Sequence, residues 1–162
     1  MEPIRYVEAI NDYYQGLGYP PYQWTVNKTT PFTRLEKPLR ECRVSMLTSG
    51  GISHCTRPPF NPQAKNDLRL DDIDPNASEA EFEINDSYYD TRDAEQDLNV
   101  VFPISRLREF AEEGMIGSIA PRFWSGFMGR TYTRARVTRT AAPALASELQ
   151  KDEVDLFLLV PA

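Results

Sequence analysis

Five consecutive apolar residues, Leu156 to Val160, place the strongest constraint on how this chain folds. An unbroken apolar run of this length is typical of a central strand in a parallel sheet that helices cover on both faces. Residues 44–48 predict a second short strand, which runs directly into Ser49-Gly50-Gly51, where glycine permits a sharp turn. We therefore expect a buried sheet whose strands end in functional loops.

Helical spacing of apolar residues alternates with these short strands. The predicted helices span residues 2–15, the segment between Pro103 and Gly114, and residues 142–151. This alternation predicts an α/β domain with a mostly parallel open sheet flanked by helices, of Rossmann or flavodoxin type. Only Pro161 and Ala162 follow the last predicted strand, so whether the sheet is complete at its C-terminus stays open at this point.

The prolines of the first third fall in clusters and predict a loop-rich lead-in. We expect residues 1–40 to form an N-terminal helix with a proline-rich connection, and residues 41–162 to form the α/β domain. The segment 124–129, rich in aromatic residues and glycine, predicts a packed turn near a pocket.

Composition excludes several classes of protein. The 162 residues include 18 Lys and Arg against 24 Asp and Glu, and the resulting net charge of −6 disfavours nucleic acid as a partner. No apolar run approaches the roughly 20 residues that cross a bilayer, and the first residues do not resemble a signal peptide. We expect a cytoplasmic protein with no membrane partner.

Charge is distributed unevenly along the chain. Half of the acidic residues lie between positions 66 and 97, whereas positions 114–147 hold five arginines and no acidic residue. One interpretation is a solvated acidic loop packed near a basic one within the subunit. The other is a basic rim, within 122–139, that binds an anionic ligand or a partner subunit through arginine forks.

Three residues are candidates for catalysis: His54, Cys55 and Asp90. Neighbouring side chains on extended backbone point to opposite sides, so a direct pair between His54 and Cys55 is awkward. Asp90 suits either acid/base chemistry or capping of a turn in solvent. Two cysteines and one histidine lack the spacing of a zinc site, so no metal is expected. We expect no disulfide between Cys42 and Cys55, because the strand between them is too long.

An ordered series of short motifs resembles the selenoprotein B family of glycine, sarcosine, betaine and D-proline reductases, closest to the short D-proline type. The series consists of Thr48-Ser49-Gly50-Gly51-Ile52, Pro58-Pro59-Phe60, Tyr89-Asp90, the runs 97–108 and 113–120, Ser125 with Phe127-Met128-Gly129, and the run 155–161. It covers about three quarters of the chain. The resemblance implies a substrate site that includes Ser49, Gly50, Gly51, Asn99, Ser125, Met128 and Gly129.

In that family a selenocysteine follows the valine-proline end of the last strand after one residue, so the resemblance places it directly after Ala162. Its codon otherwise means stop. We hypothesise that the reading frame continues beyond this chain; the competing hypothesis is a family member that has lost the redox tail. The DNA downstream decides between them, because an in-frame continuation must encode proline, a spacer and cysteine.

The resemblance implies reductive cleavage of a carbon–nitrogen bond alpha to a carboxylate in a small amino-acid-like substrate. Its selenolate attacks the alpha carbon, while a pyruvoyl group on a partner subunit holds the amine and a thiol electron donor protein supplies electrons. No cofactor is expected in this chain, nor activity from the 162 residues alone. Family histidines near positions 87–89 and 123 are replaced here, which puts the substrate assignment in doubt.

Two hypotheses stay open beside the reductase component. One is a non-catalytic binding or assembly subunit that retains the fold but lacks the redox tail. The other is a thiol enzyme that depends on Cys55.

Overall fold

The computed structural model describes residues 3–22, 26, 28–31 and 33–162, and it divides the chain into two units, Met1–Arg34 and Leu35–Ala162. The described residues of the first unit include the helix α1 (Tyr6–Gly16), which has no buried residue. The helix predicted over 2–15 is confirmed from residue 6 onward; Glu2, where the prediction began, lies outside the described residues. Within the described residues, no helix is long and apolar enough to cross a membrane.

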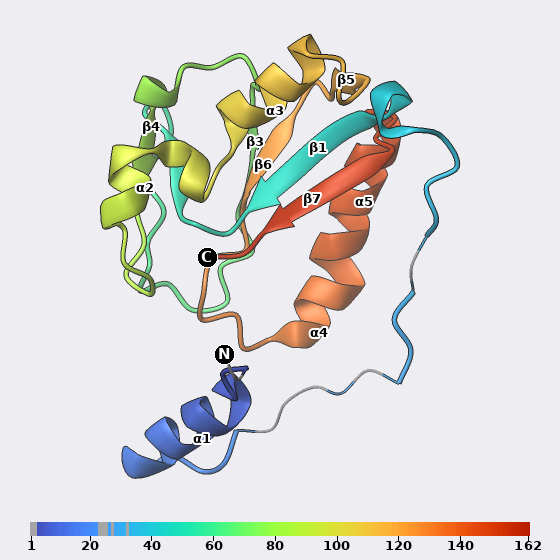
Figure 1. Cartoon of the computed structure of the whole chain (residues 1–162). Coiled ribbons are helices and arrows are strands. Elements are labelled where there is room, and N and C mark those ends of the chain that lie inside the picture. The colour runs from blue at the N-terminus through green and yellow to red at the C-terminus, as the bar shows by residue number, and fades with distance from the viewer. Residues whose placement is uncertain (1–2, 23–25, 27, 32) are drawn as a thin grey trace. The chain divides into compact units, whose positions relative to one another are not determined.

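Five strands of the second unit form one sheet around a central strand (Figure 1). The strands are β1 (Arg43–Thr48), β3 (Leu70–Ile73), β5 (Ser118–Ile119), β6 (Phe123–Gly126) and β7 (Leu156–Val160). On one side, β1 pairs in parallel with β5 near its start and with β6 near its end. On the other side it pairs in parallel with β7 over five residues. Of these five strands β3 is the one that pairs antiparallel, so the predicted mostly parallel α/β class is confirmed.

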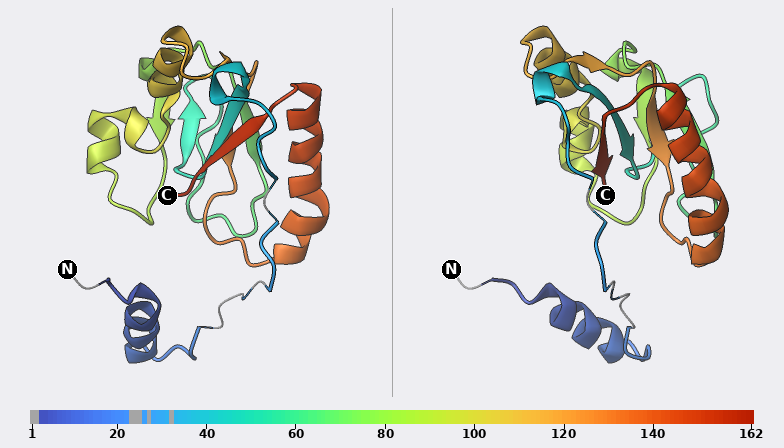
Figure 2. Two further views of the ribbon diagram at one scale, coloured as in Figure 1. Left: turned by 45° about the vertical axis from the view of Figure 1, so that its right-hand side comes forward. Right: turned by 90° about the vertical axis from the view of Figure 1, so that its right-hand side faces the viewer.

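Helices cover both faces of this sheet (Figure 2). One face carries α2 (Arg92–Gln96) and α3 (Ile104–Glu112), and the other carries α5 (Ala142–Lys151), which continues from α4 (Arg134–Arg136) through a π-helical turn. A separate two-stranded sheet pairs β2 (Ile52–His54) with β4 (Phe82–Ile84). The bounds of α5 match the prediction, and Gly114 takes the left-handed conformation (φ +70°) that ends α3.

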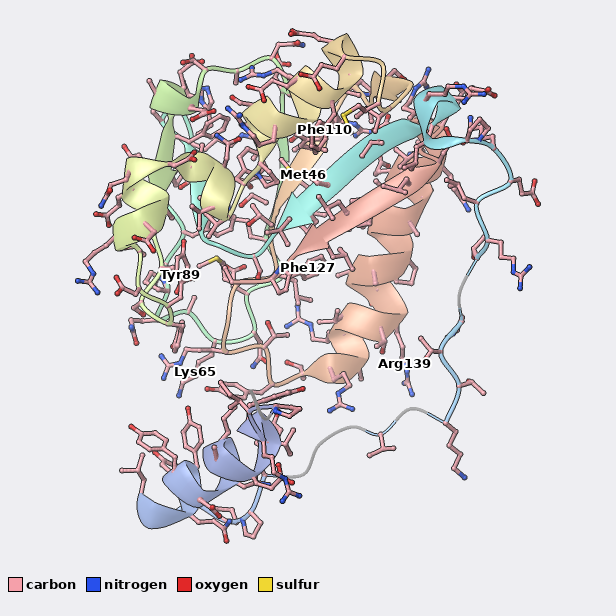
Figure 3. All side chains as sticks on the ribbon, viewed as in Figure 1. Met46, Lys65, Tyr89, Phe110, Phe127 and Arg139 are labelled. Atoms are coloured by element: carbon pink, nitrogen blue, oxygen red, sulfur yellow. The ribbon has the colours of Figure 1, made fainter. Side chains whose placement is uncertain are left out.

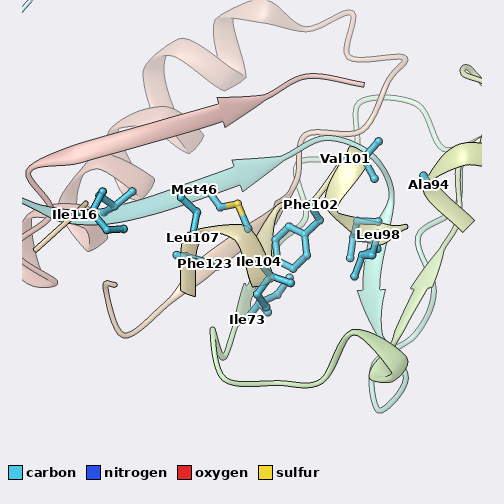
Figure 4. Packing of buried hydrophobic residues seen from close by; sticks show 12 residues of the cluster. Met46, Ile73, Ala94, Leu98, Val101, Phe102, Ile104, Leu107, Ile116 and Phe123 are labelled. Carbon is cyan, nitrogen blue, oxygen red and sulfur yellow. The ribbon is translucent and has the colours of Figure 1, made fainter. Parts of the chain in front are cut away.

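Apolar side chains from β1, β6 and α3 form the main core (Figure 4). Met46, Phe102 and Phe123 are all fully buried there. The rings of Phe102 and Phe123 meet edge to face at 6.3 Å between centroids, and Phe82 adds a second T-shaped contact to Phe102 at 5.5 Å. This cluster fixes α3 against the sheet and so supports the loop that follows β1.

An ion-pair network attaches α5 to the opposite face. Arg122 donates two hydrogen bonds to Asp152 at 2.7 and 2.9 Å and one to Glu148 at 2.9 Å, while its guanidinium lies over the Trp124 ring. These carboxylates raise the pKa of Arg122 above its ordinary value. The hydrogen-bond partners of Arg122 therefore come from α5 and from Asp152, the residue that caps it.

Three local predictions are wrong. Within the described residues β7 pairs with β1 alone, so residues 156–160 form an outer strand of the sheet in this chain rather than a central one; Leu158 and Leu159 are 37% and 62% exposed. Residues 123–126 form the fully buried strand β6, where a turn was expected at 124–129. The acidic segment, which one of the two interpretations made a solvated loop, instead contributes β3, where the buried Asp71 forms ion pairs with Arg69 and Arg57.

We expect Phe102→Ala to lower the free energy of unfolding of the second unit by about 3–5 kcal/mol, because it removes a fully buried ring. Val100→Ala is the matched control, since Val100 lies two residues away and is 56% exposed; its effect is within about 0.5 kcal/mol. Urea denaturation followed by tryptophan fluorescence measures both. Equal losses from the two substitutions would contradict the assignment of the core.

Candidate functional site

The carboxyl ends of β1 and β7 meet at the bend formed by Ser49, Gly50 and Gly51, which we call the double-glycine bend. The backbone N–H of Ser49 donates to the carbonyl of Val160 at 3.1 Å, and the N–H of Ala162 donates to the Ser49 hydroxyl at 3.1 Å. In open α/β sheets, ligands bind outside the carboxyl ends of the strands. The bend therefore occupies the position expected for a functional site.

Glycine is required at the second glycine position of the bend. Gly51 has a φ of +70°, and a Cβ there would lie 2.5 Å from the backbone oxygen of Asn85. That close approach allows the N–H of Asn85 to donate to the Gly51 carbonyl at 2.9 Å. A side chain at this position would therefore separate the bend from the segment that follows β4.

Tyr89, in the segment between β4 and α2, contacts the bend through its side chain. Its hydroxyl donates to the carbonyl of Gly50 at 2.9 Å. Burial raises the pKa of Tyr89 to about 12, and the charges of Asp86 and Glu95 add to this effect. Tyr89 is therefore a neutral hydrogen-bond donor over the ordinary range of pH.

Hydroxyl side chains line the end of the sheet beneath the bend. Thr48 donates to the carbonyl of Val101 at 2.7 Å and accepts from the N–H of Gly50 at 3.1 Å. Ser125 lies opposite Thr48 in the register of β1 and β6, and its Oγ is buried without a hydrogen-bond partner in the described part of the chain. Ser125 is therefore an unused hydroxyl next to the bend.

The segment after β6 supplies the apolar side of the site. Phe127 adopts a left-handed φ of 51°, unusual for a bulky residue, and the next residue, Met128, is only 5% exposed. The Met128 methyl group reaches within 3.0 Å of where a Cβ on Gly51 would lie. Gly129 packs against the Tyr88 ring. Figure 3 shows that Phe127 and Tyr89 come from different segments on this side of the molecule.

The structure thus brings Ser49, Gly50, Gly51, Ser125 and Met128 together. Among the remaining predicted residues, Gly129 lies next to this group, since it follows Met128 directly.

The other candidates make their contacts elsewhere. His54 packs on Phe82 of β4, with its Nδ1 2.8 Å from the Thr56 hydroxyl, and Cys55 is exposed. Asn99 accepts from the N–H of Ser105 at 3.1 Å in the first turn of α3, which is a capping role.

Asp90 is exposed and forms an ion pair with Arg92. Hydrogen bonds from the Arg92 side chain, and then from its backbone N–H, lower the pKa of Asp90. A carboxylate held in its charged form is a poor general acid, so this contact favours a structural role in the turn.

Two cavities differ in their chemistry. One of about 150 Å³ lies beside the bend and is lined by Leu47, Ser49, Leu159, Val160 and Pro161. Another of about 550 Å³ lies between β4 and α2 and is lined by carboxylates and apolar residues: Glu79, Phe82, Glu83, Ile84, Asn85, Ala94, Glu95, Gln96 and Leu98. The larger cavity disfavours an anionic ligand, because three glutamates and no basic residue line it.

Two residues at the bend were not predicted. Asn85 and Tyr89 contact the glycines only through the tertiary fold, across more than thirty positions in sequence. Tyr89 belongs to the motif series that carried the resemblance, but nothing in that motif specified its contact with Gly50.

Comparison with known proteins supports the resemblance. The family described as glycine/sarcosine/betaine reductase selenoprotein B matches residues 21–162. The chain is also 31% identical over 140 residues to the D-proline reductase subunit gamma of Acetoanaerobium sticklandii. This match covers 86% of this chain and 53% of the relative. The chain therefore spans about half the length of that curated relative. No solved structure matches.

We expect Gly51→Ala to destabilise the protein more than Gly114→Ala. Both glycines have a φ of +70°, and the left-handed conformation alone costs an alanine about 1–2 kcal/mol. Only Gly51 also meets a backbone oxygen, whereas Gly114 has open space, so overpacking adds about 1–3 kcal/mol. Urea denaturation of the two variants measures the difference, and equal losses would show that the bend is not tightly packed.

The raised pKa of Tyr89 predicts a loss of stability at high pH. The folded protein holds the neutral phenol, so the stabilisation is complete below the ordinary pKa of 10 and is lost as the pH rises toward 12. In urea denaturation between pH 9 and 12, the advantage of the wild type over Tyr89→Phe should shrink above pH 10. Parallel curves for the two proteins would contradict this prediction.

Proposed function

Because this chain belongs to the glycine/sarcosine/betaine reductase selenoprotein B family, we propose that it is a component of an amino-acid reductase of the D-proline type. The reaction is the reductive cleavage of a carbon–nitrogen bond alpha to a carboxylate. One observation carries the proposal: Ser49, Gly50, Gly51, Ser125 and Met128, which the family resemblance selected, meet at the carboxyl end of the sheet.

The end of β7 determines where the residues after position 162 lie relative to this site. Because the N–H of Ala162 donates to the Ser49 hydroxyl, residues that follow position 162 in family members start at the double-glycine bend. We place the selenocysteine of such members there. In such members that residue would supply the nucleophile, and a partner subunit would supply the pyruvoyl group. The residues described here bind and orient the substrate.

The chemistry of the bend fits a small, mostly neutral part of a substrate. Ser49 offers a hydroxyl, Tyr89 holds the Gly50 carbonyl in place, and Met128 supplies an apolar wall. None of these side chains carries a positive charge at neutral pH. The counter-charge for a substrate carboxylate is therefore proposed to come from the partner subunit.

Reconstitution tests this function. The protein alone should not reduce D-proline, glycine, sarcosine or betaine with dithiothreitol as the reductant. Turnover should require both the selenocysteine-containing form of the chain and a pyruvoyl-bearing partner subunit, with D-proline as the preferred substrate. Turnover by the 162 residues alone would overturn the proposal, and so would a complete complex that reduces none of the four compounds.

A variant separates a catalytic component from an assembly subunit. In the reconstituted complex we expect Ser49→Ala to lower kcat/KM for D-proline by about tenfold, the value of one lost hydrogen bond near the substrate. Ser147→Ala is the control, because Ser147 is exposed on α5. Unchanged turnover for Ser49→Ala in a normally assembled complex would favour the non-catalytic role.

A further inference from the structure

Two of the outer strands of the sheet, β3 and β7, differ in how they are protected from pairing with another chain. β3 carries Asp71 and Asp72, which form ion pairs with Arg57 and Arg69. Charged side chains on an outer strand discourage further pairing. β7, by contrast, consists of Leu-Phe-Leu-Leu-Val with no charge, proline or bulge within it. β7 therefore lacks the protection that β3 has.

Apolar side chains remain exposed on both faces of β7. Leu158 and Leu159 are 37% and 62% exposed, and as neighbours on a strand they point to opposite faces of the sheet. A strand with apolar side chains on both faces is the pattern of an interior strand in a parallel sheet. The sequence of β7 therefore suits a position with neighbours on both sides.

The backbone of β7 is open along the same edge. The carbonyl of Val160 faces β1 and accepts from the N–H of Ser49, the residue that follows β1. In a parallel ladder alternate residues face opposite neighbours, so the N–H and C=O groups of Phe157 and Leu159 point away from β1. Across the described residues, no hydrogen bond joins these groups to another segment. The edge thus offers donors and acceptors at the spacing of a strand.

We propose that β7 is an interior strand of a larger sheet. The outer edge of β7 pairs with an apolar strand, and this strand belongs to polypeptide that corresponds to the half of the D-proline reductase subunit gamma outside the match. About half of that relative lies outside the match, which is enough for several further strands. Pairing would cover Leu158 and Leu159, and it would cover the side of the 150 Å³ cavity that Leu159 lines.

Hydrogen exchange tests the pairing without any assay of activity. The full 162-residue chain is co-expressed with the tagged part of the Acetoanaerobium sticklandii relative outside the match, and the same part is also fused after Ala162. In the co-purified complex and in the fusion, amides of residues 156–160 should exchange at least tenfold more slowly than in the chain alone. Amides of β3 (70–73) should be unchanged.

Two variants identify the outer edge as the contact. Leu159→Pro removes an N–H that points outward and should abolish both co-purification and the added protection, whereas Leu159→Ala keeps the N–H and should retain them. The proposal is overturned if residues 156–160 exchange equally fast in all forms. It is also overturned if the chain alone shows concentration-dependent protection and twice the monomer mass, which would identify a second copy as the neighbour.

Discussion

The parallel ladder on both sides of β1 is the interaction on which the rest of the structure depends. Every residue of β1 from Val44 to Thr48 is buried, so its backbone groups need partners from the neighbouring strands. β5 and β6 satisfy one side and β7 the other. Because all of these strands run in the same direction, their carboxyl ends arrive together, and the chain has to turn there.

Packing at that turn leaves little space for side chains, so its chemistry comes from backbone groups and hydroxyls. Asn85 and Tyr89 both bond to glycine carbonyls of the bend. These contacts hold two carbonyls in fixed directions while Ser49 keeps a hydroxyl at the end of β7. The rigidity of the bend thus follows from the close approach that glycine permits.

Elements with strong local signals were predictable from sequence, and those set by tertiary partners were not. The helix 142–151 and the stop at Gly114 follow from periodicity and from the left-handed preference of glycine. β6 was missed because Trp124 to Gly126 has the composition of a turn, although β1 and β3 enclose it. The burial of Asp71 depends on Arg69 and on Arg57, which lies fourteen residues earlier in the chain, and no local pattern indicates that neutralisation.

The same distinction applies to the site. The family resemblance selected the glycines, Ser125 and Met128, because each belongs to a motif of the ordered series. The contact of Tyr89 with Gly50 could not be predicted, since it depends on how the segment after β4 crosses the end of the sheet. Asn99 was selected for the same reason as Ser125, yet it caps α3, because an amide before a helix satisfies free backbone donors.

β7 links the site to whatever covers its outer edge. Its Val160 carbonyl holds the N–H of Ser49, and Leu159 lines the cavity into which the bend opens. An outer strand with one neighbour has half the ladder of an interior strand, so its position is held less firmly. A strand added along β7 would restrict the Val160 carbonyl and, through it, the Ser49 hydroxyl. Completion of the sheet and orientation of the substrate-facing groups would then be parts of one structural event.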